Sequence, residues 1–175
     1  MNLYFRLFST LIKALFCKKI NLLDTTTLRF RVSPLDCDLN LHLTNSRYLA
    51  FMDIGRINFI ARTKMLGKLL RTGYRPVVAD CEISFLKPLN PLQKFHVTTK
   101  LLSWDDKYQY FYQTIKHKGN DYATALIKTA FVKKGRVISS QTIIKLIDNN
   151  LSVPPLPESV TLLQKLSKAK QSAWR

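Results

Sequence analysis

The sequence predicts an α+β fold in which one long helix packs against an antiparallel sheet. Apolar residues recur at helical spacing from about Ser46 to Leu70. An alternating strand precedes this helix, and four strand-like segments separated by short turns follow it. An antiparallel sheet with a helix on one face is a stable layer arrangement for this order. The length of 175 residues and a hydrophobic content of 46% predict a folded chain with its own core.

The chain is strongly basic, with 28 Lys+Arg against 11 Asp+Glu and a net charge of +17. Such a charge attracts nucleic acid, anionic lipid, an acidic carrier protein or a phosphate-rich ligand. Because no nucleic-acid motif accompanies the basic residues, we predict no nucleic-acid partner. The three cysteines are too widely spaced for a disulfide framework, which indicates a reducing compartment. We therefore expect a cytoplasmic location and leave open whether the protein also associates with a membrane.

Residues 1–21 predict an amphipathic helix, because apolar residues at 4, 5, 8, 11, 12, 15 and 16 share one helical face. The run is too short to span a membrane, and no cleavage site of a signal peptide follows it. Two positions stay open for this helix: peripheral contact with a membrane through residues 1–19, or packing on the domain. We expect the main domain to span residues 22–150 and a helical tail to span residues 151–175.

The other elements follow from periodicity and turn residues. Thr26–Ser33 alternates as a half-buried strand that Pro34 ends. The long helix has possible N-caps at Thr44, Asn45 and Ser46, and we expect a break near Gly67. Short turns predict hairpins between consecutive strands. The predicted later segments are strands Arg75–Leu86, Phe95–Ser103, Tyr108–Lys116 and Tyr122–Val132, a short helix that reaches Ile147, and an exposed helix Glu158–Lys170.

The stretch DCDLNLHLTN, residues 36–45, carries the candidate chemistry. It begins like a calcium-binding loop, but Leu41 stands where such a loop needs Gly, and Arg47 stands where it needs Glu. The three histidines lie in separate segments, so we predict no metal site. Cys37 lies between two carboxylates, which disfavour the reactive thiolate. We therefore interpret Cys37 as a small packing residue and not as a nucleophile.

A carboxylate-centred hydrolytic site is the remaining chemical interpretation. A carboxylate attacks an acyl carbonyl itself or acts as general base for water. Backbone N–H groups at the start of the following helix offer donors for an oxyanion. Asn40 is placed to orient water, and His42 to move a proton or hold the loop. The alternative is that Asp36 and Asp38 only accept hydrogen bonds from loop amides, and the residue chemistry leaves both open.

The same stretch and the helix after it resemble the motif of hotdog-fold acyl thioesterases, D-x-D-x-x-G-H-x-N-N-x-x-Y followed by an acidic residue and Arg. The resemblance extends to the 4-hydroxybenzoyl-CoA thioesterase-like group and to proteins of the thioesterase superfamily member six type. It implies a hotdog fold, hydrolysis of an acyl-CoA or acyl-carrier-protein thioester, no cofactor, and a homodimer or dimer-based tetramer. The matching positions are Asp36, Asp38, His42, Asn45, Tyr48, Asp53 and Arg56.

The resemblance also implies roles for individual residues. Asp38 takes the place of the catalytic carboxylate, and Asn40 and His42 match functional positions of carrier-protein thioesterases. Leu41, Thr44 and Asn45 lie where relatives orient the substrate and its oxyanion. Leu41 replaces a glycine, and because its Cβ resists positive φ, we expect altered donor geometry. A non-catalytic hotdog module that binds acyl chains or a membrane is the alternative function.

Overall fold

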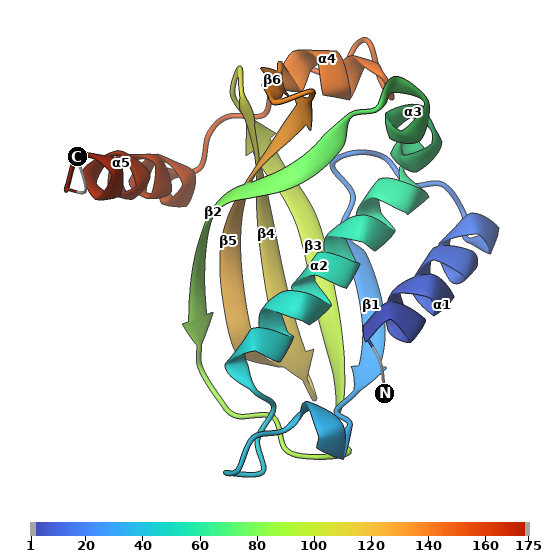
Figure 1. Ribbon diagram of the computed structural model, residues 1–175, viewed down its shortest axis with the longest axis vertical. Coiled ribbons are helices and arrows are strands. Elements are labelled where there is room, and N and C mark those ends of the chain that lie inside the picture. Colours follow the sequence, from blue (N-terminus) through green and yellow to red (C-terminus); the bar gives the residue numbers. More distant parts are fainter. Residues whose placement is uncertain (1–2, 174–175) are drawn as a thin grey trace.

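A curved antiparallel sheet wraps around one long helix (Figure 1), and the computed structural model describes residues 3–173. The strands are β1 (Thr26–Arg31), β2 (Arg75–Phe85), β3 (Lys94–Trp104), β4 (Tyr108–His117), β5 (Asn120–Lys133) and β6 (Arg136–Ile138). Their spatial order is β1-β3-β4-β5-β2, with β6 beside β5, and every pair is antiparallel. The predicted α+β class is confirmed.

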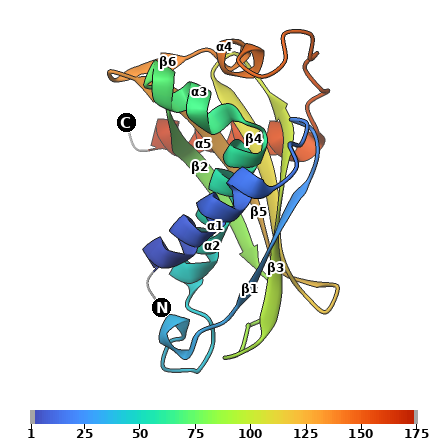
Figure 2. The ribbon, with the colours of Figure 1, turned by 90° about the vertical axis from the view of Figure 1, so that its right-hand side faces the viewer.

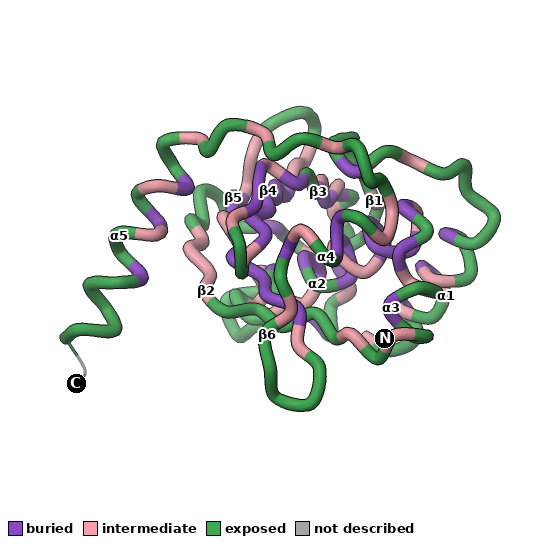
Figure 3. The backbone as a smooth tube through the Cα atoms, turned by 90° about the horizontal axis from the view of Figure 1, so that it is seen from above, coloured by how far each residue is buried: buried purple, intermediate pink, exposed green. Residues whose placement is uncertain are grey.

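The helices lie on both faces of the sheet. They are α1 (Leu3–Phe16), the 3-10 turn η1 (Pro34–Asp36), α2 (Asn45–Arg62), α3 (Met65–Thr72), α4 (Ser140–Lys145) and α5 (Glu158–Ala173). The long helix α2 fills the concave face, and α1 lies along α2 on the side of β1 (Figure 2). α5 lies outside the sheet, away from α2 (Figure 3). Among residues 3–173, no helix is long and apolar enough to cross a membrane.

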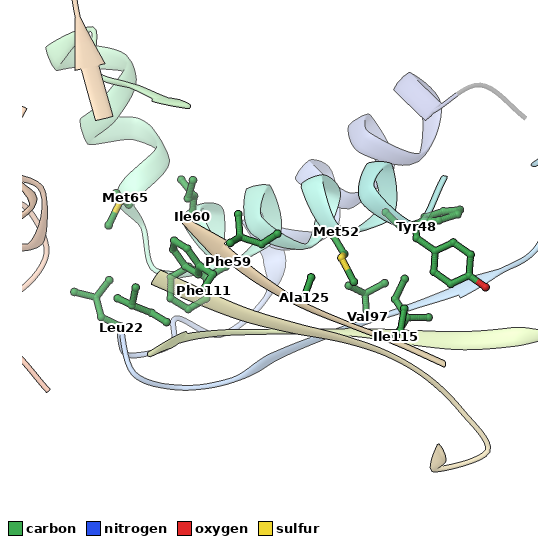
Figure 4. Packing of buried hydrophobic residues seen from close by; sticks show 14 of the residues in the cluster. Leu22, Tyr48, Met52, Phe59, Ile60, Met65, Val97, Phe111, Ile115 and Ala125 are labelled. Carbon is green, nitrogen blue, oxygen red and sulfur yellow. The ribbon is translucent and has the colours of Figure 1, made fainter. Parts of the chain in front are cut away.

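The core lies between α2 and the concave face of the sheet. Met52 and Phe59 of α2 point toward Val97, Phe111 and Ile115 of the strands, and all five are buried (Figure 4). Each such side chain contributes roughly 1.5–3 kcal/mol through removal of apolar surface from water. This packing holds α2, whose N-terminal end follows the candidate loop, against the sheet.

The predicted hairpin between the first two strands after the helix is wrong. β2 pairs with β5 at the far edge of the sheet, and β3 pairs with β1 and β4. The connection between β2 and β3 contains Pro88 and Pro91, which do not continue a strand ladder. Leu89 in this connection instead accepts a hydrogen bond from the Leu43 amide at 2.8 Å. The segment thus runs beneath the candidate site.

The helix break also differs from its predicted place near Gly67. α2 ends at Arg62, and Lys64 adopts a left-handed φ of 61° before α3 begins. The Thr63 hydroxyl donates to the carbonyl of Phe59 at 3.0 Å, which closes the last turn. Gly67 lies within α3. The three-residue strand β6 is too short for its periodicity to be recognised in the sequence.

The two terminal helices each bury one face. α5 was expected to be exposed, but Val160 and Leu163 pack against buried Tyr110 on the outer face of the sheet. α1 packs on the domain through Arg6, Thr10 and Ala14, while most of its large apolar side chains face outward. The apolar face recognised in the sequence is therefore the exposed face of α1.

Candidate active site

The candidate site is the loop between η1 and α2, and hydrogen bonds close this loop at its base. The carbonyl of Asp36 accepts from the Thr44 amide at 3.0 Å and from the Thr44 hydroxyl at 3.1 Å. Cys37 and Leu43 form an isolated antiparallel bridge directly above. Thr44 thus occupies the N-cap position of α2 with its side chain directed to the loop and not to the helix. The loop is short and well fixed at both ends.

Asp38 lies at the exposed tip of the loop. Its Oδ1 atom accepts from the backbone amides of Asn40 at 2.9 Å and His42 at 3.3 Å. Its Oδ2 atom has no hydrogen-bond partner within residues 3–173. One carboxylate oxygen therefore stabilises the loop, as the structural alternative expected, and the other is available to a substrate or to water.

A pocket of about 250 Å³ opens beside Asp38. Asp38, His42 and Asn45 line it from one side. The opposite wall is the end of β2 and the segment after it, residues 85–88, which bring Lys87 to the pocket. The structure therefore brings three of the predicted site residues together. Asn40, Leu41 and Thr44 lie in the same loop but do not line the pocket.

Leu41 adopts a φ of +56°, the left-handed conformation that a glycine would favour. Its side chain is 68% exposed, so the Cβ is accommodated without a clash in the core. The Leu41 amide donates to the carbonyl of Asp38 at 3.0 Å. The loop therefore has the glycine-like backbone despite the leucine, and the Leu41 N–H is already used within it.

The start of α2 supplies backbone donors. The amides of residues 40–44 all donate to groups within the protein. The next two amides, of Asn45 and Ser46, have no acceptor among the residues described. They lie at the N-terminal end of an 18-residue helix, where the helix dipole favours negative charge. These two amides are the first donors after residue 44 without an acceptor among the described residues.

Cys37 is unsuited to nucleophilic chemistry. Burial raises the pKa of its thiol, and the carboxylates of Asp36 and Asp38 raise it further. The Sγ atom lies 3.6 Å from the carbonyl of Ser33, to which the thiol donates. The thiol is therefore protonated at neutral pH, in agreement with the packing role expected for it. Over residues 3–173, no group of three or more His, Cys, Asp or Glu side chains could hold a metal ion.

A second, apolar cavity of about 400 Å³ runs along α2. Its walls come from α1, α2, β2, β4 and β5, and include Ile57, Val78 and Leu7. Asp53 and Arg56 also line it and form an ion pair, and Arg56 donates to Gln113 at 2.5 Å. Burial lowers the pKa of Arg56, and the charge of Asp53 opposes this shift. The cavity is mainly apolar, with one charged pair at its wall.

Sequence reasoning missed Arg6 of α1. Its guanidinium nitrogen lies 2.7 Å from Oδ2 of Asp36, and the two side chains are only 4% and 1% exposed. The signal available in the sequence was that Arg6 and Lys13 interrupt a largely apolar helical run, and it did not distinguish the two. Its partner, 30 positions along the chain, gives no local pattern.

A curved antiparallel sheet around a long helix, with a carboxylate loop at the start of that helix, defines the hotdog class of thioesterase-like proteins. The chain belongs to the Thioesterase-like superfamily, whose family model matches residues 32–164. The resemblance drawn from the motif is thereby confirmed.

Individual relatives agree with this membership. A probable thioesterase of Saccharomyces cerevisiae is 34% identical over 113 residues, which cover 62% of this chain and 48% of that protein. Protein THEM6 of Xenopus laevis is 32% identical over 96 residues, which cover 55% of this chain and 46% of that protein. The chain therefore spans about half the length of these curated relatives. A solved 4-hydroxybenzoyl CoA thioesterase, 15% identical, has the same fold with a TM-score of 0.64 over 71% of this chain and 99% of that one.

Proposed function

We propose that this protein hydrolyses acyl thioesters of CoA or of an acyl carrier protein to the free acid and the thiol. The observation that carries the proposal is the shared pocket of Asp38, His42 and Asn45 at the N-terminal end of α2. One oxygen of Asp38 is unpaired there, and free backbone donors lie close by in the chain. A reactive carboxylate and an oxyanion site are the two parts that thioester hydrolysis requires.

In this proposal Asp38 acts through Oδ2, as the nucleophile on the thioester carbonyl or as the general base for water. The amides of Asn45 and Ser46 stabilise the oxyanion, because the Leu41 amide is already bonded to Asp38. Asn40 and His42 orient water and substrate from the same loop. Thr44 holds the base of the loop through its bonds to Asp36.

The substrate's two ends match two features of the molecule. The acyl chain occupies the apolar cavity along α2, and the phosphates or the acidic carrier bind the basic surface beside the pocket. Lys87 lines the pocket itself, and Lys94 begins the following strand. A net charge of +17 favours such anionic ligands at low salt. CoA is the carrier named for the structural neighbour, which was solved with 4-hydroxybenzoyl CoA.

The test is thiol release from a panel of acyl-CoA and acyl-carrier-protein thioesters. We expect Asp38→Asn to lower kcat at least about a hundredfold, because the amide keeps the loop bonds but removes the base. Asp148→Asn is the matched control, since Asp148 accepts from the amide two residues on at 2.9 Å in the same way. Equal activity of Asp38→Asn and the parent protein would overturn the role of Asp38. Binding without hydrolysis by the parent would favour the non-catalytic acyl-binding module.

A homodimer belongs to the same proposal. The edge strand β2 pairs only with β5 in the part of the chain described, and its outer edge carries exposed Val77 and Val78. Unpaired edges with apolar side chains pair with a second chain readily. Sedimentation equilibrium is expected to give a dimer, which Val78→Glu weakens. The control Val137→Glu changes a valine of similar exposure on β6 and is expected to leave the dimer intact.

Contact with a membrane surface is a second proposed property, and it concerns residues 1–19. Phe5, Phe8 and Phe16 are between 62% and 88% exposed on the outer face of α1. Apolar side chains beside lysines suit an anionic bilayer surface. Co-sedimentation with anionic vesicles is expected to fall for Phe8→Asp. Leu162→Asp, on the exposed side of α5, is the control and is expected to bind like the parent.

A further inference from the structure

The contacts of α1 are unusual for an amphipathic helix. Its buried face is Arg6, Thr10 and Ala14, and its phenylalanines point to solvent. Apolar burial alone would dock this helix in the opposite orientation, with the phenylalanines inward. In the observed orientation a polar contact is buried at the interface, and Arg6 makes it.

Arg6 contacts both the candidate loop and α2. Its NH2 atom lies 2.7 Å from Asp36 Oδ2, and its guanidinium carbon lies 4.7 Å from the centre of the Phe51 ring. A second cation, Arg47, approaches the other Asp36 oxygen at 3.4 Å but is 36% exposed. A buried carboxylate needs a close counter-charge. Of the two arginines, Arg6 lies closer to Asp36 and is better shielded from solvent.

Asp36 is in turn the residue that closes the loop. Its carbonyl accepts both bonds from Thr44, and the loop between them carries Asp38. Asn45, with its free amide, follows Thr44 directly. Any movement of Asp36 therefore changes the relative position of Asp38 and the start of α2. The two aspartates of the motif have separate positions: Asp36 is buried at the base and Asp38 is exposed at the tip.

We propose that Arg6 is a positioning residue of the active site, through which α1 holds the Asp36–Asn45 loop in its working geometry. The kinetic part of this inference rests on the proposed hydrolysis, and its structural part does not. In this proposal α1 both covers α2 and positions the loop that carries Asp38.

The test combines kinetics with amide hydrogen exchange on the full chain. We expect Arg6→Gln to lower kcat between about tenfold and a hundredfold with a smaller change in KM, because misplacement by about 1 Å has effects of this size. Exchange at residues 38–44 is expected to accelerate at least about tenfold as the loop opens more often. The double variant Arg6→Gln/Asp36→Asn is expected to recover part of both losses, because it leaves no buried charge unpaired.

Two matched controls separate positioning from general packing. Thr10→Val alters the same buried face of α1 without touching the loop, and Lys13→Gln removes one positive charge from the exposed side. Both are expected to keep the parent's kcat and loop exchange. Equal losses in Thr10→Val and Arg6→Gln, with no recovery in the double variant, would overturn the proposal.

Two further outcomes are decisive. If Arg6→Gln does not fold, Arg6→Lys keeps the charge but loses the planar contact with Phe51. Unchanged loop exchange and unchanged kcat in Arg6→Lys and in Asp36→Asn would then overturn the role of Arg6. If the parent protein hydrolyses no thioester, the proposed function fails, and loop exchange in the Arg6 variants still decides whether α1 holds the loop.

Discussion

The hydroxyl of Tyr48 accepts a hydrogen bond from the backbone amide of Leu89 at 3.1 Å, joining residues 41 positions apart. The same hydroxyl donates to the carbonyl of Lys87 at 3.4 Å. Leu89 is fully buried, so its amide has no access to water. This single side chain therefore links the first turn of α2 to the wall of the site pocket that carries Lys87.

Tyr48→Phe is expected to lower the free energy of unfolding by about 1–3 kcal/mol, because it leaves the buried Leu89 amide without an acceptor. Urea unfolding followed by circular dichroism measures the change. Tyr112→Phe is the control, because Tyr112 is 39% exposed, and we expect a change within about 0.5 kcal/mol. The same cost in both variants would contradict the importance of the Tyr48 hydroxyl.

Leu41→Gly is expected to raise the free energy of unfolding by up to about 1 kcal/mol, since Leu41 is exposed and holds a φ of +56°. Leu39→Gly is the control in the same loop. Leu39 is also exposed but has no positive φ, so glycine there is expected to cost about 0.5–1 kcal/mol. Thermal unfolding measures both variants. A loss of stability in Leu41→Gly like that in Leu39→Gly would show that the backbone of Leu41 is unstrained.

Gly55 of α2 faces side chains of β3 and β4 at close range. A Cβ atom at this position would lie 2.8 Å from the hydroxyl oxygen of Thr99, which is buried. Gly55→Ala is therefore expected to destabilise the protein by about 1–3 kcal/mol through overpacking. Gly67→Ala in α3 meets nothing within 4 Å and is expected to stabilise by about 0.5–1 kcal/mol. Chemical unfolding should show a lower free energy of unfolding for Gly55→Ala and a higher one for Gly67→Ala. Changes of the same sign in both variants would refute this packing argument.

Asp105 makes stability depend on pH in the acid range. Burial alone would raise its pKa, but hydrogen bonds from Tyr110, Lys107, Tyr108 and Gln164 outweigh burial and lower the pKa below the ordinary 3.8. A carboxylate with a depressed folded-state pKa contributes stability above pH 3.8, and this contribution is lost as the pH falls through the folded value.

Asp105→Asn is therefore expected to flatten the fall of stability with acid between about pH 5 and pH 2.5. Part of the dependence of stability on pH is expected to remain in this variant, because the pKa of Asp80 is also lowered. Tyr110→Phe removes one of the bonds to Asp105 and is expected to flatten the slope less. The measurement is the midpoint of thermal unfolding across this range, and an unchanged slope in Asp105→Asn would rule out the contribution.

Several features were predictable because their causes are local. The alternation in Thr26–Ser33 and the spacing from Ser46 onward predict a strand and a helix from neighbours along the chain. Strand pairing is not local, and the hairpin predicted around Pro88 was wrong because β2 crosses to the far edge. The break near Gly67 was misplaced because Lys64, which has no special signal in the sequence, adopts the left-handed turn.

By itself the sequence determined the class of fold, the position of the candidate loop, and the motif that marks the family, because these depend on periodicity and spacing. Only the tertiary structure decided that Asp36 is buried against Arg6 while Asp38 is exposed at a pocket. It also decided that α1 presents its aromatic side chains to solvent. The physical reason is that the environment of a charge depends on residues that folding brings beside it, and residues 6 and 36 meet only in the folded chain.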